Sequence, residues 1–192
     1  MKIKKWVYSN EDRQWSEGKP ETGAGRQAFV RPNGQRHQKM NGFGGCFNEQ
    51  GYGALDCLEQ AEQEKLLEEL FAPGENGCNL TLCRMPIGAN DYSFDWYSLN
   101  ETPGDYEMKH FSLERDRKAL IPYIRRAQAY QPGLKLFASP WSPPVWMKNP
   151  PVYNWGKLIK TEENLGAYAL YFRRFIEEYE KENIHIDQVH VQ

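Results

Sequence analysis

The sequence has no apolar run approaching the roughly 18–20 residues that a membrane-spanning helix needs, so no stable membrane insertion is expected. It has no excess of positive charge either, because 24 Lys and Arg stand against 26 Asp and Glu, for a net charge of -2. This balance argues against a nucleic-acid-binding surface and against a polybasic membrane patch. The basic start, residues 1–5, has no apolar stretch after it. This predicts no signal peptide and a cytoplasmic location, or secretion if a leader has been lost.

Potential metal ligands are few and badly spaced. The cysteines are Cys46, Cys57, Cys78 and Cys83. Cys78 and Cys83 lack the two-residue spacing of a zinc knuckle, so reduced thiols are expected, with a disulfide as the less favoured alternative. His185 and His190 lie an odd number of positions apart in a strand-like stretch, which places them on opposite faces. The sequence therefore predicts no metal and no other cofactor.

Aromatic side chains are abundant, at 14% of all residues, with 6 Trp and 11 Tyr. Large aromatic residues usually contribute to a hydrophobic core. Sugar-binding surfaces use them too, because the apolar face of a pyranose stacks on a flat ring. Composition alone leaves both interpretations open. The 40% hydrophobic and 26% charged content is typical of a globular chain, and 192 residues is the size of one ordinary domain.

Residues 1–37 differ from the rest of the chain. A short strand is expected at residues 6–8. The remainder of this segment is interrupted by turn-forming residues, namely Gly18, Pro20, Gly23, Gly25, Pro32 and Gly34. Extended chain and strand pieces are therefore expected here, and no helix.

From residue 38 onward, strand-like and helical stretches alternate. Strands are expected at 42–47, 79–85, 134–138 and 184–191, and helices at 54–71, from about 121 to 131, and at 162–181. The apolar face predicted for the first helix consists of Leu55, Leu58, Leu67 and Leu70. The face predicted for the last helix consists of Leu165, Ala169, Phe172, Ile176 and Tyr179.

This alternation predicts parallel βα units and an α/β fold. A closed eight-stranded barrel needs about 250 residues, and only four strands are expected here. The predicted architecture is therefore the first half of a (β/α)8 TIM barrel, with a short N-terminal β segment. A complete open sheet is the less favoured alternative, because it leaves two exposed parallel edges. In barrels of this kind the chemistry lies at the carboxyl ends of the strands.

Four residues near those strand ends are candidate substrate-binding groups. Arg84 can hold a carboxylate with two hydrogen bonds, although a salt bridge at the barrel rim is the alternative. Asp91 lies among aromatic residues and can accept hydroxyl hydrogen bonds. Trp141 lies in a proline-stiffened loop that suits a stacking platform, whereas Trp146 is expected to pack in the core. Glu49 follows the first strand and is the fourth candidate.

Three motifs in order resemble glycoside hydrolase family 30, the glucosylceramidase-like enzymes. They are Gly42-Phe43-Gly44-Gly45-Cys46-Phe47, the run from Cys83-Arg84-Met85-Pro86 to Asp91-Tyr92-Ser93, and the run from Ala138-Ser139-Pro140-Trp141 to Val145-Trp146-Met147-Lys148. The resemblance covers nearly all of residues 38–192. It implies that residues 1–37 belong to an accessory β-sandwich. It also implies that Asp91 binds a sugar hydroxyl, that Arg84 lies near the catalytic carboxylates, and that Trp141 contacts the first sugar.

The family cleaves β-linked glycosides with retention, using one glutamate as acid/base and another as nucleophile. The resemblance places the acid/base directly after Gln192 and the nucleophile at the end of the seventh strand, so no catalytic residue is expected in this chain. The isolated chain is then expected to be inactive and to self-associate through exposed strand edges. A non-catalytic carbohydrate-binding chain and one half of a split enzyme are the alternatives. The sugar is not readable: glucosylceramidase, β-glucosidase, β-xylosidase and β-1,6-glucanase activities all fit.

Overall fold

The computed structural model divides the chain into two compact units, Met1–Lys39 and Met40–Gln192. It describes residues 6–10, 13–18, 33–74 and 77–191, the first two ranges as backbone only. In the first unit, strand β1 (Trp6–Asn10) pairs antiparallel with β2 (Arg13–Gly18). A strand therefore lies where one was expected, and the assignment of residues 1–37 to an accessory sandwich stays a prediction.

The second unit is built on a parallel sheet in sequence order. Its strands are β3 (Leu82–Ile87), β4 (Lys135–Pro140) and β7 (Gln188–Val189), and β4 lies in the middle. The segment 43–47 runs parallel beside β3, because the Arg84 N–H donates to the Gly45 carbonyl and the Phe47 N–H donates to the Arg84 carbonyl, both at 2.9 Å. A side chain at Gly44 would meet the Leu82 carbonyl oxygen at 1.6 Å, so only glycine permits this approach.

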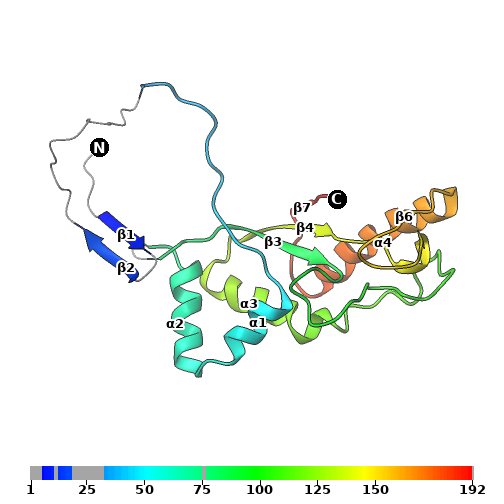
Figure 1. The fold of residues 1–192 in the computed structure, drawn as a ribbon, viewed down its shortest axis with the longest axis horizontal. Helices are drawn as coiled ribbons and strands as arrows, with labels where there is room; N and C mark the ends of the chain where they lie inside the picture. Colours follow the sequence, from blue (N-terminus) through cyan, green and yellow to red (C-terminus); the bar gives the residue numbers. More distant parts are fainter. Residues whose placement is uncertain (1–5, 11–12, 19–32, 75–76, 192) are drawn as a thin grey trace. The chain divides into compact units, whose positions relative to one another are not determined.

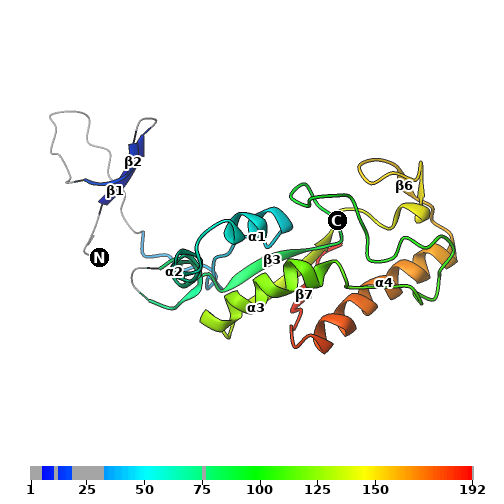
Figure 2. The same cartoon turned by 90° about the horizontal axis from the view of Figure 1, so that it is seen from below.

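Helices connect the strands and lie along one side of the sheet (Figures 1 and 2). They are α1 (Glu49–Asp56), α2 (Gln60–Phe71), the short η1 (Asp116–Lys118), α3 (Leu120–Tyr130) and α4 (Glu162–Lys181). The loop after β4 holds the short η2 (Val145–Met147) and the antiparallel pair β5 (Lys148–Asn149) and β6 (Lys157–Leu158). Parallel strands joined by helices confirm the predicted α/β architecture.

Alternation along the strands separates a core face from an inner face. Cys83, Met85 and Ile87 of β3 are buried and belong to the core that the helices cover. Arg84 of β3 and Phe137 of β4 lie between those positions and are only partly buried. The inner face of the sheet therefore presents polar and aromatic groups, as the lining of a barrel does.

The single helix expected at 54–71 is wrong, because the structure forms two helices there. The first begins at Glu49, since the Asn48 side chain accepts the Gly51 N–H at 2.7 Å and caps it. The helices break between Asp56 and Gln60, and Leu58 in the break is 38% exposed, whereas Leu67 is fully buried. The expected leucine face therefore belongs only partly to the core.

The helix expected at 162–181 has the predicted bounds but a different buried face. Thr161 caps it by accepting the Asn164 N–H at 3.2 Å. Its buried residues are Asn164, Ala167, Tyr168, Tyr171, Phe175 and Tyr179, whereas the predicted Leu165 is 47% exposed. The Leu99 N–H donates to the Tyr171 hydroxyl at 3.1 Å, and such partners, distant in sequence, turn the tyrosine face inward.

Three observations bear on membranes and metals. None of the helices in the described residues is both long and apolar enough to cross a bilayer. All four cysteines are free, and only Cys83 is buried. In the same described parts of the chain, no cluster of three or more His, Cys, Asp or Glu side chains has the arrangement of a metal site.

The sheet has two exposed edges within the described residues. The segment 43–47 pairs only with β3 and β7 only with β4. Phe43, beside the first edge, is 68% exposed. We expect the chain to self-associate, because unpaired strand edges and exposed apolar groups recruit other chains. Size-exclusion chromatography with light scattering should show dimers or larger species, and a monodisperse monomer with a cooperative melt would contradict this.

Candidate functional site

The first feature of the site is an arginine held on the inner face of the sheet. Arg84 Nε donates to Ser139 Oγ at 2.8 Å, which joins β3 to β4. Ser139 is 4% exposed and Arg84 is half-buried. On the same face, the Phe137 ring stacks on His190 with centroids 5.0 Å apart. The Arg84 guanidinium is therefore oriented near the carboxyl ends of the strands, where a fork of N–H donors suits a carboxylate or a sugar hydroxyl.

The second feature is the turn that presents Asp91. Asn90 Oδ1 accepts the Tyr92 N–H at 2.8 Å, and the Asn90 N–H donates to Ser93 Oγ at 3.0 Å. The Gln50 N–H, in the first turn of α1, donates to the Tyr92 carbonyl at 3.0 Å. Asp91 is exposed at the tip of this turn. A rigid turn with a solvent-facing carboxylate is ready to accept ligand hydroxyls.

The third feature is the loop after β4, which carries Trp141. This indole is 38% exposed. Next to it, Ser142 Oγ accepts a hydrogen bond from Lys148 Nζ at 2.7 Å, and the same Nζ donates to the Tyr153 carbonyl at 2.8 Å. Lys148 is 6% exposed, and burial lowers the pKa of its ammonium. A buried lysine therefore fixes the loop beside Trp141.

The loops after β3 and β4 are joined to each other. Glu101 Oε1 accepts from the Tyr153 hydroxyl at 3.0 Å, and Oε2 accepts from the Val145 N–H at 3.3 Å. Trp146 Nε1 donates to the Asn100 carbonyl at 3.0 Å, and its ring packs against the core. Trp146 is thus a packing residue, as expected. The two loops form one connected rim at the strand ends.

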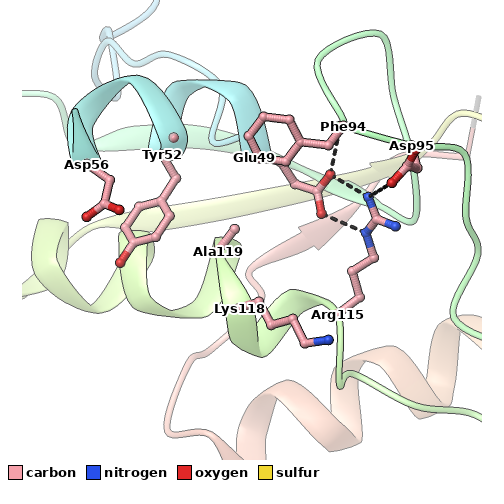
Figure 3. A pocket seen from close by; sticks show the side chains of 9 residues that line it. Glu49, Tyr52, Asp56, Phe94, Asp95, Arg115, Lys118 and Ala119 are labelled. Atoms are coloured by element: carbon pink, nitrogen blue, oxygen red, sulfur yellow. Dashed lines mark hydrogen bonds and ion pairs between the residues drawn. The ribbon is translucent and has the colours of Figure 1, made fainter.

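Glu49, the fourth candidate, lies in a pocket of about 470 Å³ between α1, the residues at and beside η1, and the loop after β3 (Figure 3). Arg115 Nε donates to Glu49 Oε1 at 2.8 Å and Arg115 Nη2 donates to Oε2 at 3.0 Å. The Phe94 N–H also donates to Oε2, at 2.8 Å. Glu49 is 4% exposed. Its substrate-binding role stays a prediction, but both oxygens already have donors, which favours a structural role.

A second buried carboxyl group lies beside this pocket. Asp116 is 1% exposed and accepts from the Tyr97 hydroxyl at 3.0 Å and the Tyr179 hydroxyl at 2.7 Å. Burial raises the pKa of Asp116 to about 6, although the two tyrosine hydrogen bonds act in the opposite direction. Burial raises the pKa of both tyrosines as well. Asp116 therefore joins η1 to α4 through Tyr179, and it holds the loop after β3 through Tyr97.

Arg84 thus lies within β3, and Asp91 and Trp141 lie in the loops that follow β3 and β4, whereas Glu49 lies in the first turn of α1 and is paired with Arg115. Sequence reasoning did not find Ser139, Lys148 or Arg115 as their supports. Ser139 could have been found from the strand register, because it lies two positions beyond Phe137, the partner of Arg84. Nothing in the local sequence marks Lys148, which bonds within its own loop, or Arg115, whose partner Glu49 lies 66 residues away.

Three comparisons place this geometry among known proteins. The family model described as "Glycosyl hydrolase family 30 TIM-barrel domain" matches residues 40–192. The lysosomal acid glucosylceramidase of Mus musculus is 33% identical, over 83% of this chain and 32% of that protein. An endo-1,6-β-D-glucanase of Neurospora crassa is 28% identical, over 84% of this chain and 34% of that protein.

A solved structure agrees with these relatives. The crystal structure of SrfJ from Salmonella typhimurium superposes with a TM-score of 0.73 and 33% identity, over 79% of this chain and 34% of that one. The chain spans only 28% to 35% of the length of these curated relatives. The matched part is thus a partial barrel, which agrees with the strands described above.

Proposed function

Because the chain belongs to the glycosyl hydrolase family 30 TIM-barrel family, we propose that it is the first half of the catalytic barrel of a retaining β-glycoside hydrolase. Its share of the work is to bind the non-reacting parts of the glycoside. The observation that carries this proposal is the Arg84 side chain on the inner face of the parallel sheet, fixed by Ser139 at 2.8 Å, with Asp91 and Trp141 in the loops that follow β3 and β4.

Each of the three residues has a distinct proposed role. The exposed Asp91 carboxylate accepts sugar hydroxyls. Trp141 stacks on the apolar face of the ring in the first subsite. Arg84 binds and keeps ionised a catalytic carboxylate, since a guanidinium lowers the pKa of a neighbouring acid. Glu49 acts indirectly, by holding the Phe94 N–H and therefore the loop that carries Asp91.

Cleavage itself needs two carboxyl groups about 5 Å apart, one as acid/base and one as nucleophile. The described strand residues of β3, β4 and β7 include no Asp and no Glu. We therefore propose that both glutamates belong to the part of the parent protein that this chain does not span. The chain alone then binds but does not hydrolyse, because acid/base and nucleophilic catalysis are both missing.

The proposed substrate is a β-glucoside. The mouse relative is named for glucosylceramide and the Neurospora relative for a 1,6-β-D-glucan, and both contain a β-linked glucose. A β-xyloside is the second candidate, because a matching solved structure is titled a family 30 xylanase. The alternative function is a non-catalytic carbohydrate-binding chain, in which Arg84, Asp91 and Trp141 bind the sugar and no hydrolysis follows.

The test is a titration of the 192-residue chain with methyl β-D-glucoside and methyl β-D-xyloside, followed by tryptophan fluorescence and ligand-observed NMR. We expect binding of the glucoside, weakened by about tenfold in both Asp91→Asn and Trp141→Ala, with no release of nitrophenol from nitrophenyl β-glucoside. Asp56→Asn, an exposed aspartate on α1, is the matched control and should bind like the wild type.

Two results would count against the proposal. Turnover by this chain alone would show that a complete acid pair lies within it. Binding that is unchanged in both Asp91→Asn and Trp141→Ala would place the sugar elsewhere. A longer parent protein that supplies the rest of the barrel should hydrolyse the same nitrophenyl glucoside. Sugar binding by that parent without hydrolysis would favour the non-catalytic alternative.

A further inference from the structure

A pair of aromatic rings outside the three proposed binding residues bridges the two loops of the rim. The Trp96 indole, in the loop after β3, stacks on the Tyr153 ring, in the loop after β4, with centroids 5.6 Å apart and planes 16° apart. Trp96 is 48% exposed, whereas the neighbouring Tyr97 is 8% exposed and belongs to the core. An indole held flat and half in water presents one free ring face.

The pair is rigid because Tyr153 is held at both ends. Its hydroxyl donates to Glu101 Oε1 at 3.0 Å, and its carbonyl accepts from the buried Lys148 Nζ at 2.8 Å. The same Nζ donates to Ser142 Oγ at 2.7 Å, and Ser142 follows Trp141 directly. The Lys148 ammonium group therefore links Tyr153 of the aromatic pair to Ser142, the residue that follows Trp141. Such fixed geometry lowers the entropic cost of binding a ligand.

The chemistry around the ring favours a sugar over an alkyl chain. The Tyr153 hydroxyl donates to Glu101 Oε1 at 3.0 Å, so a hydroxyl and a carboxylate lie at the edge of the aromatic pair. A pyranose offers an apolar face to the indole and hydroxyls to these polar groups, whereas an alkyl chain gains nothing from them. Aromatic rings with adjacent polar groups are the usual composition of such sites.

We infer that Trp96, positioned by Tyr153, forms an outer subsite for a second sugar residue of a β-linked glycan. This inference rests on the proposed function, because it extends the same rim. The subsite makes the chain favour a disaccharide over a monosaccharide, and the sugar that it holds is separate from the one on Trp141.

The experiment compares methyl β-D-glucoside, gentiobiose, cellobiose and octyl β-glucoside by ligand-observed NMR on the whole chain. We expect at least one disaccharide to bind about fivefold more tightly than the monosaccharide in the wild type. Trp96→Ala should abolish that advantage and leave the monosaccharide affinity unchanged, and Trp96→Phe should restore it. Trp155→Ala is the matched control, since Trp155 is 79% exposed and has no stacked neighbour within the described residues.

The other outcomes are equally decisive. An unchanged disaccharide advantage in Trp96→Ala overturns the subsite and leaves the proposed function standing. Loss confined to octyl β-glucoside overturns it too, because the ring then serves an alkyl chain. If no ligand binds to the wild type, the proposed function fails and the subsite fails with it. If Trp141→Ala and Trp96→Ala weaken the monosaccharide equally, the two rings share one sugar and the second subsite is rejected.

Discussion

Arg115→Met is expected to destabilise the chain by about 3–5 kcal/mol, because it leaves a buried carboxylate without its counter-charge. The Glu49 side chain is 5% exposed, and Arg115 meets it with two hydrogen bonds, at 2.8 and 3.0 Å. Only the Phe94 N–H would remain as a donor. The substitution also removes the guanidinium from the Tyr97 ring, 4.3 Å from its centroid. Urea denaturation followed by circular dichroism measures the loss.

Two variants identify the cause of this effect. The double variant Arg115→Met with Glu49→Gln should recover a large part of the lost stability, because no buried charge is left uncompensated. Arg173→Met is the matched control, since Arg173 pairs with Glu177 at 2.7 Å but its side chain is 74% exposed, and its loss should be about 0.5 kcal/mol or less. A loss in Arg115→Met no larger than in this control would show that the buried pair contributes nothing.

The stability of the chain should depend on pH through Asp116. Burial raises the pKa of this carboxyl from 3.8 to about 6 in the folded state. The folded state therefore holds the proton more tightly than the unfolded state does. The stabilisation is fully present below the unfolded pKa and is lost as pH rises through the folded pKa. The complete loss, from well below pH 4 to above pH 7, is about 3 kcal/mol, and about 2 kcal/mol of it falls between pH 4 and pH 6.

Asp116→Asn removes this titration. The stability of the wild type relative to the variant should fall by about 2 kcal/mol from pH 4 to pH 7, in urea denaturation at each pH. The groups that face Asp116 are Tyr97, Tyr179, Glu49 and Arg115, all of which the variant retains. Asp91→Asn is the control, because Asp91 is exposed and bonds to nothing in the described chain. Parallel profiles for the wild type and Asp116→Asn would contradict the prediction.

Asp116→Ala separates the charge from the hydrogen bonds. It leaves the hydroxyls of Tyr97 and Tyr179 buried without their present partner, and each such group costs about 1–3 kcal/mol. This variant should therefore be less stable than Asp116→Asn at every pH. The difference in stability between Asp116→Ala and Asp116→Asn measures the contribution of the two tyrosine hydrogen bonds, and the difference between Asp116→Asn and the wild type measures the effect of the charge.

Local signals in the sequence predicted several elements correctly. The helix at 162–181 has its predicted bounds because Thr161 caps it and acidic residues fill its first turn. The glycines of 42–47 predicted a close approach of this segment to a neighbouring strand, and a Cβ added at Gly44 would indeed lie 1.6 Å from the Leu82 carbonyl oxygen. The order of strands and helices predicted the parallel sheet. The three family motifs predicted the family, whose model matches residues 40–192.

Other features depend on partners that lie far away in the sequence. The buried face of α4 shares Tyr179 with the predicted one but also includes Tyr171, whose hydroxyl accepts the Leu99 N–H, whereas the predicted Leu165 is exposed. The helix expected at 54–71 is two helices, and a periodicity of leucines could not show the break. Glu49 sits after a strand, as a substrate ligand would, yet Arg115 takes its carboxylate into an ion pair.

The amino-acid sequence by itself determined the α/β class and the order of the strands, because these follow from short-range periodicity, and its contiguous motifs showed the resemblance to the family. Only the tertiary structure decided which side chains pair with one another inside the protein and are therefore not available to a ligand. It joined Glu49 to Arg115, Glu101 to Tyr153 and Trp96 to Tyr153, pairs whose members lie far apart in the sequence. Burial and hydrogen bonding depend on which surfaces meet after the helices pack on the sheet, and no local pattern encodes that meeting.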